Sequence, residues 1–248
     1  MVSEGLSNES LQAEEARIQA AYARRQGDDL RYSWFSPGHL FMVQERERQI
    51  LTLLKQHDFG TLKTKKILEI GCGTGYWLRE FIKWGARPEN IVGMDLLPGL
   101  VAEAKQLCPS AVQVQCDGAS KLAFPDATFD LVLQSTVFTS ILDAAMKQSI
   151  AHEMMRVVKD RGLILWYDYH VDNPWNPDVR GVKKREIRRL FPGCQIKLRR
   201  TTLAPPIVRF LTPYSWLASY VLAKIPLFCT HYLGLIQKIE SKVPQVPR

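Results

Sequence analysis

A glycine turn lies between a short apolar segment and a helix-like segment. Residues 69–75 are Glu-Ile-Gly-Cys-Gly-Thr-Gly, with Ile67 and Leu68 before them and a helical pattern at 76–82 after them. Glycine has no Cβ and tolerates positive φ, and the first N–H groups of a helix point outward without partners. A ligand can therefore approach this backbone closely. The pattern predicts a strand, a glycine turn and a helix N-terminus that together form a small-molecule site.

The surrounding segments decide what this turn belongs to, because its spacing, GxGxG, differs from the dinucleotide-binding spacing GxGxxG. A second apolar segment, 91–95, ends in Asp95, a position where such folds accept hydrogen bonds from ribose hydroxyls. The segment 112–118 repeats this pattern with Asp117, and the segment 129–135 ends in polar residues. Strands that alternate with helical segments and end in such clusters predict a parallel α/β sheet with a binding crevice at one edge.

Together these segments resemble the class I S-adenosylmethionine-dependent methyltransferases. The resemblance rests on the glycine turn, on Asp95, on Cys-Asp-Gly-Ala at 116–119, on Phe-Asp-Leu-Val-Leu at 129–133 and on the segment 154–165. It implies a single Rossmann-like sheet of seven strands with the last strand antiparallel. It also implies a methyltransferase with S-adenosyl-L-methionine as its cofactor, and it says much less about the acceptor.

We expect strands at 66–70, 91–95, 112–116, 129–134, 163–169, 194–203 and 231–238, and helices at 76–84, 98–107, 141–158 and 183–190. Helices at about 11–25 and 39–57, joined by an aromatic loop at 32–39, predict an N-terminal lid over residues 1–58. In the second of these helices, the charged residues 45–48 are expected to face outward. The methyltransferase domain is expected to cover residues 59–248.

The segment 204–230 is rich in apolar and aromatic residues but contains several prolines and charges, and its apolar runs are too short to span a bilayer. It predicts a helical insertion before the last strand. This insertion fits a lid or core-packing role, a dimer contact, or an element at a membrane interface.

The resemblance implies a set of cofactor contacts at the strand ends. The glycine turn would contact the methionine moiety and the ribose, Asp95 would accept from both ribose hydroxyls, and Asp117 would accept from the adenine amino group. Glu69 would orient the turn, Gln134 would face the cofactor, and side chains of the lid would reach the methionine carboxylate or the acceptor. The lid aromatics fit equally well as packing between helices and core. The expected cofactor contacts are Tyr22, Arg25, Tyr32, Glu69, Gly71, Cys72, Gly73, Gly75, Asp95, Leu96, Asp117, Gly118, Ala119 and Gln134.

Methyl transfer to a hydroxyl needs a general base. Asp168 and His170 stand at the C-terminal end of the fifth expected strand, and His39 lies in the aromatic loop, so these three are the candidate catalytic residues, although each also fits a structural role. The residues 134–137 are Gln-Ser-Thr-Val, which lacks the Asn/Asp-Pro-Pro-Tyr signature of amino-group methylation of nucleic-acid bases. Such a reaction is therefore disfavoured.

The charge pattern and the cysteines restrict partners and location. The net charge is +8, and the stretch 180–200 holds nine basic residues against one acid, Glu186. Such a field attracts phosphates or an anionic membrane surface, but it also fits a solvated helix face, and without interleaved aromatics it does not predict nucleic-acid binding. Five cysteines without a CxxC pair indicate neither a disulfide framework nor a metal site. An N-terminus without an apolar stretch predicts a cytoplasmic location, with peripheral contact at the inner membrane face as an additional hypothesis.

The leading hypothesis is therefore methyl transfer to a small-molecule acceptor, namely a hydroxyl of a sugar in a surface polysaccharide or lipid-linked glycan. Methylation of a lipid or quinone is the alternative reaction. A non-catalytic interaction scaffold with the cofactor fold is the third hypothesis, but the intact glycine turn and the two acids, Asp95 and Asp117, argue against it. No oligomeric state is predicted.

Overall fold

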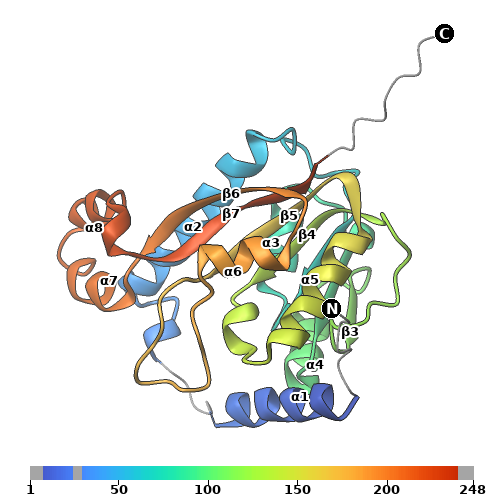
Figure 1. The fold of residues 1–248 in the computed structure, drawn as a ribbon. Coiled ribbons are helices and arrows are strands. Elements are labelled where there is room, and N and C mark those ends of the chain that lie inside the picture. Colours follow the sequence, from blue (N-terminus) through green and yellow to red (C-terminus); the bar gives the residue numbers. More distant parts are fainter. Residues whose placement is uncertain (1–7, 25–29, 240–248) are drawn as a thin grey trace.

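The structure, a computed structural model, describes residues 8–24 and 30–239 and contains one seven-stranded sheet in the order β3-β2-β1-β4-β5-β7-β6 (Figure 1). The strands are β1 (Ile67–Ile70), β2 (Ile91–Asp95), β3 (Gln113–Cys116), β4 (Phe129–Ser135), β5 (Val158–Tyr169), β6 (Cys194–Leu203) and β7 (Cys229–Lys238). The first five strands pair in parallel, whereas β7 pairs antiparallel with both β5 and β6. The predicted sheet with an antiparallel last strand is confirmed.

The helices cover both faces of this sheet. They are α1 (Asn8–Ala23), α2 (Pro37–Lys55), α3 (Tyr76–Lys83), α4 (Pro98–Leu107), α5 (Ala144–Val157), α6 (Lys184–Leu190), α7 (Pro205–Leu211) and α8 (Trp216–Leu222). Alternate residues of a strand point to opposite faces. On β4, accordingly, Leu131 and Leu133 belong to the core cluster with α2, α3 and α4, while Val132 belongs to the cluster with α1, α5 and α6.

The fifth strand begins earlier than the sequence predicts. β5 begins at Val158 rather than at residue 163, because Val158 already pairs with Phe129 and a register irregularity follows between Phe129 and Leu131. A Cβ at Gly162 would lie 3.0 Å from the Asp130 carbonyl oxygen, so the strands approach closely there. Because residues 159–161 are charged, a search for apolar runs does not include this first part of the strand. α5 is correspondingly shorter than the expected helix at 141–158.

Helix α2 does not expose the residues that its sequence pattern predicts to be exposed. The Glu45 side chain is buried, and its carboxylate accepts hydrogen bonds from Gln49 Nε2 (2.7 Å) and Lys224 Nζ (3.2 Å). Arg46 is only partly exposed. The prediction that residues 45–48 face outward is therefore wrong for Glu45 and holds only in part for Arg46 and Glu47, whereas Arg48 is exposed. The cause is that α2 packs against the sheet on one side and against α7 on another.

The insertion before the last strand is helical, as predicted, and comprises α7, α8 and a short 3-10 turn at Pro226–Phe228. It packs against the start of α2 through a small core of Phe41, Leu203, Val208 and Ala223. In Figure 1, α7 and α8 extend from one end of the sheet, where β6 and β7 meet them. No described helix is both long enough and apolar enough to cross a bilayer.

Candidate functional site

The glycine turn takes the left-handed backbone conformation that its sequence requires. Gly71, Gly73 and Gly75 have φ values of +69°, +53° and +76°, which residues with a Cβ rarely adopt. A Cβ added at Gly71 would lie 2.4 Å from Val137 Cγ2, whereas a Cβ at Gly73 would have no atom within 4 Å. The backbone around Gly73 therefore has an open side, which a ligand can approach.

Asp95, the last residue of β2, fastens this turn to the sheet. Its carboxylate accepts hydrogen bonds from the Gly73 N–H (2.8 Å) and from the Leu97 N–H (2.9 Å), one on each oxygen. A carboxylate oxygen has two lone pairs, so both oxygens can accept a further donor. Burial raises the pKa of Asp95, and the bonds from the backbone oppose that rise. Leu96, the next residue, is partly buried beside it.

Two polar side chains below the turn each have one atom without a hydrogen-bond partner among the described residues. Glu69 is 1% exposed, and its Oε2 has no hydrogen-bond partner. Burial first, and then the charge of Asp95, raises the pKa of Glu69 well above its usual value. On the neighbouring strand β4, fully buried Gln134 accepts from the Val137 N–H (3.2 Å), while its Nε2 has no partner. Buried polar atoms are normally satisfied, so a polar ligand at this edge would complete both groups.

The end of β3 borders a small hollow beneath α1. The hollow has a volume of about 230 Å³ and is lined by Asn8, Leu11, Gln12, Glu15, Asp117, Gly118, Ser120 and Lys121. The Asp117 carboxylate is exposed and accepts from the Gly118 N–H (2.8 Å). Ala119 is buried in the core. Asp117 and Gly118 thus line an accessible space, as a role in binding adenine requires.

The other sequence-predicted cofactor contacts are more dispersed. Cys72 is buried, and its N–H donates to the Met94 carbonyl (2.9 Å), which ties the turn to β2. The Tyr22 hydroxyl lies 3.4 Å from Ser140 Oγ, near the loop that follows β4. Tyr32 is 60% exposed and contacts the ring of His39. Arg25 lies outside the described residues.

Among the three candidate bases, Asp168 is enclosed. It is fully buried, and its carboxylate accepts hydrogen bonds from the hydroxyl and N–H of Thr139 and from the Tyr169 N–H. Burial raises its pKa to about 7, although these bonds oppose the rise. These bonds connect Asp168, on β5, to the loop after β4.

The two histidines differ in how their rings are held. His170 is buried, its Nε2 donates to the Cys229 carbonyl (3.0 Å), and burial lowers its pKa. His39 is half-buried, and its ring packs edge-on against Trp34 with 5.3 Å between centroids. Burial and the positive charge of Arg46 lower the pKa of His39, so its ring is neutral near pH 7. Of the three candidate bases, His39 is the one whose side chain is least engaged by hydrogen bonds from the described residues.

An aromatic cluster that the sequence analysis does not predict lies where the lid meets the sheet. It consists of Tyr32, Trp34, His39, Tyr76, Trp77, Tyr167, Tyr169 and His231. The ring contacts form two groups, one that includes Trp34 against Tyr76 (6.0 Å between centroids) and one that includes Tyr169 against His231 (3.7 Å). Arg46 lies over three of these rings, with 4.7 Å from its guanidinium carbon to the Trp77 ring centroid. The aromatic loop at 32–39 was the available signal, but the contribution of β5 and β7 requires the tertiary fold.

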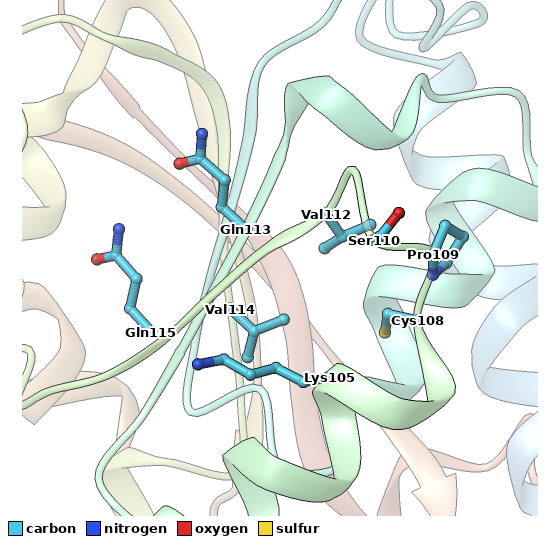
Figure 2. A pocket seen from close by; sticks show the side chains of 8 residues that line it. All are labelled: Lys105, Cys108, Pro109, Ser110, Val112, Gln113, Val114 and Gln115. Carbon is cyan, nitrogen blue, oxygen red and sulfur yellow. The ribbon is translucent and has the colours of Figure 1, made fainter.

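A larger groove lies elsewhere, between the end of α4 and strand β3 (Figure 2). It has a volume of about 510 Å³ and is lined by Lys105, Cys108, Pro109, Ser110, Val112, Gln113, Val114 and Gln115. None of these residues belongs to the predicted site. Size alone therefore does not identify the site, and the strand-end groups described above do.

The residues at the strand ends fit S-adenosylmethionine. The cofactor offers ribose hydroxyls for the spare lone pairs of Asp95 and polar atoms for Glu69 and Gln134. The open side at Gly73 leaves room for it, because nothing lies within 4 Å of a Cβ there. The hollow at Asp117 and Gly118 can accommodate a base.

Comparisons with known proteins agree with this geometry. Residues 67–162 match a family model described as a methyltransferase domain. The chain is 32% identical over 104 residues to a malonyl-[acyl-carrier protein] O-methyltransferase of Serratia marcescens (41% of this chain, 37% of the relative). It is 25% identical over 187 residues to a sterol 24-C-methyltransferase of Aspergillus fumigatus (69% and 48%). The matches thus span less than half of the length of these two relatives.

The fold is also shared with solved structures. A SAM-dependent methyltransferase from Archaeoglobus fulgidus aligns with a TM-score of 0.55 and 15% identity, covering 80% of this chain and 98% of that one. At this identity the likeness establishes the fold. Together with the family match over 67–162, it confirms the resemblance to the class I methyltransferases.

Proposed function

We propose that this chain, whose residues 67–162 form a methyltransferase domain, transfers a methyl group from S-adenosylmethionine to a small-molecule acceptor. The observation that carries the proposal is the open backbone at Gly73 beside an Asp95 carboxylate with spare lone pairs. Two relatives with different acceptors are both named as methyltransferases, which supports the same reaction class here. A non-catalytic scaffold would need neither feature.

The protein would hold the cofactor through its strand ends. Asp95 would accept from the ribose hydroxyls, the turn at Gly71, Gly73 and Gly75 would contact the methionine moiety, and Asp117 would bind the adenine amino group. Glu69 and Gln134 would complete their unpaired polar atoms against the same ligand. The bound cofactor supplies a methyl group that is already electrophilic, so the main task of the protein is to orient the acceptor and exclude water.

His39 is the residue we propose to accept the proton of an acceptor hydroxyl. A base must be unprotonated at the operating pH, and the lowered pKa of His39 meets this condition near pH 7. Its ring belongs to the aromatic cluster, on the lid side of the strand ends. Asp168 and His170 are less suited, because hydrogen bonds within the protein occupy the Asp168 oxygens and the His170 Nε2.

For the acceptor we propose a sugar hydroxyl of a surface polysaccharide or lipid-linked glycan, with a lipid or quinone as the alternative. Aromatic rings stack on the apolar faces of sugars, and the aromatic cluster supplies such rings beside His39. The insertion exposes large apolar side chains, including Phe210 (74%) and Leu227 (79%). These side chains support a further part of the proposal, peripheral contact with an anionic membrane surface on the cytoplasmic side.

The direct test is transfer of a labelled methyl group from S-adenosylmethionine into pooled glycans, lipids, quinones and phenols. We expect label in the glycan pool, and we expect His39→Ala to lower turnover by about 10² to 10⁴-fold while the affinity for S-adenosylhomocysteine stays unchanged. His152→Ala, at an exposed histidine of α5, is the matched control. Binding of S-adenosylhomocysteine without transfer to any pool would favour the scaffold instead, and absence of binding would refute the proposal.

A further inference from the structure

Two arginines beside the aromatic cluster have buried guanidinium nitrogens without partners. The Nε–H groups of Arg46, on α2, and Arg209, on α7, are both buried and donate to no partner among the described residues. A buried donor left unsatisfied costs free energy, and more so when it is charged. Such groups are satisfied by ordered water, an ion or a ligand when the protein itself does not satisfy them.

The two arginines lie near the aromatic rings at the end of β5. Arg46 lies over Tyr167, with 5.1 Å from its guanidinium carbon to the ring centroid. Burial lowers the pKa of His231, and the positive charge of Arg46 lowers it further. Burial raises the pKa of Tyr169, and the positive charge of Arg209 opposes that rise. The centroid of the Tyr169 ring lies 3.7 Å from that of the His231 ring. The backbone of Arg209 also lies against the first turn of α2, since a Cβ at Gly38 would be 3.3 Å from Arg209 Cα. Both charges therefore face the end of β5.

In the part of the chain that the structure describes, the acidic groups nearby form no ion pair with Arg46 or Arg209. Asp168 is enclosed by Thr139, and Glu47 accepts a hydrogen bond from the Tyr76 hydroxyl. Burial raises the pKa of Glu69 well above its usual value, and the positive charge of Arg46 opposes that rise. Among the described residues, no carboxylate lies within ion-pair distance of either the Arg46 or the Arg209 guanidinium. The aromatic cluster is thus a positively charged wall made mostly of ring faces.

We propose that Arg46 and Arg209 bind an oxyanion, a carboxylate or a phosphate, that the acceptor carries close to the atom to be methylated. A guanidinium presents a planar fork of donors that matches both groups, and the aromatic faces beside it pack against the ring that bears the anion. This inference rests on the proposed function and names its substrate class: the acceptor is anionic. The arginines would position the acceptor, and His39 would remain the base.

The test uses the full chain loaded with S-adenosylhomocysteine and three small probes in a calorimetric titration. Benzoate carries a carboxylate, phenyl phosphate carries a phosphate, and benzamide is the neutral match in shape. We expect one of the two anions to bind at least about tenfold more tightly than benzamide, because bonds between charged groups are the stronger ones. Which anion binds better distinguishes a carboxylate-bearing acceptor from a phosphate-bearing one.

Variants locate the binding site. Arg46→Met and Arg209→Met keep much of the side-chain volume. Each should weaken the affinity for the more tightly bound anion by about 10 to 100-fold without changing the affinity for benzamide. Arg46→Lys should recover part of the loss, because it keeps the charge but not the fork. Arg188→Met, on the exposed side of α6, is the control and should change nothing. Melting curves verify that each variant is folded.

Three outcomes would overturn the inference. Equal binding of benzamide and the anions would show that charge is not recognised. Unchanged anion binding in folded Arg46→Met and Arg209→Met would place the anion elsewhere. A weaker S-adenosylhomocysteine affinity in these variants, with anion binding unchanged, would assign the arginines to the cofactor. If the wild-type chain does not bind S-adenosylhomocysteine, the proposed function fails, and the same titration of the unloaded chain still tests the arginine pair.

Discussion

Asp95 joins the glycine turn to the cofactor pocket through a single carboxylate. Replacing it with alanine removes the acceptor for the Gly73 and Leu97 N–H groups and the proposed acceptor for the ribose. We expect a loss of about 2 to 4 kcal/mol in binding free energy for S-adenosylhomocysteine, measured by calorimetry. Asp126→Ala, at an exposed aspartate bound to Arg156, is the control. Equal affinity in Asp95→Ala and wild type would show that Asp95 does not bind the ribose.

A comparison with Gly85 distinguishes ligand contact at Gly73 from the effect of backbone strain alone. Both residues have positive φ, +53° and +95°, and a Cβ at either would have no atom within 4 Å. Alanine at each should lower stability by a similar amount, about 1 to 2 kcal/mol, because the left-handed backbone disfavours a Cβ. Only Gly73→Ala should also weaken S-adenosylhomocysteine binding, by at least about tenfold. Equal effects on binding would mean that the backbone at Gly73 does not contact the ligand.

Asp168 makes stability depend on pH. Its pKa is raised from 3.8 to about 7, so between these values the folded state holds a proton that the unfolded state has released. Stability should therefore fall as pH rises from about 4 to about 7, by about 4 kcal/mol, and then level off. Asp168→Asn should flatten this part of the profile, as chemical denaturation at several pH values would show. An unchanged slope in the variant would assign the pH dependence to other groups.

The elements that the sequence predicts best are those with one strong local signal. Strands β1, β2 and β4 are apolar runs that end in a glycine or a polar residue, which is how strands buried on both faces appear in a sequence. Because parallel strands present their carboxyl ends at the same edge, the same signals predict that Gly73, Asp95 and Gln134 lie together.

The errors occur where a long-range partner overrides the local pattern. Glu45 resembles a surface residue of an amphipathic helix, yet it is buried. It accepts a hydrogen bond from Lys224, which lies far along the chain in the insertion. Arg46 likewise lies over Tyr167 of β5. The start of β5 was predicted too late because its pairing with β4, and not its hydrophobicity, makes residues 158–162 a strand. Periodicity contains no information about such partners.

Strand β7 depends on Gly234 to fit between its two neighbours. A Cβ at Gly234 would lie 2.0 Å from the Lys197 carbonyl oxygen and 2.8 Å from Leu198 Cδ2. Gly234→Ala must therefore push β6 away, and we expect a stability loss of about 1 to 3 kcal/mol or more in thermal or denaturant unfolding. Gly99→Ala, in α4 with nothing within 4 Å, should instead be neutral or slightly stabilising. Similar effects of the two changes would argue against the tight β6–β7 contact.

Considered as a whole, the molecule gathers exposed apolar side chains at one end. The insertion exposes Phe210 (74%) on α7, Tyr214 (82%) between α7 and α8, Leu217 (73%) on α8 and Leu227 (79%) in the turn after them. Its other side packs against α2. Large exposed apolar patches mark surfaces that meet a partner or a membrane. With a net charge of +8, attraction to an anionic surface would add to the burial of these side chains.

Sedimentation with anionic vesicles tests this surface. We expect the wild-type chain to sediment at low salt and less at high salt, because screening weakens the attraction between charges. The triple change Phe210→Ser, Leu217→Ser and Leu227→Ser should reduce binding at every salt concentration, by about tenfold or more, since each side chain contributes apolar area. Trp175→Ser, at an 89% exposed aromatic in the loop after β5, is the matched control. A triple variant that binds as the wild type does would exclude the insertion, and a wild-type chain that stays in the supernatant at low salt would end the membrane proposal while leaving methyl transfer in place.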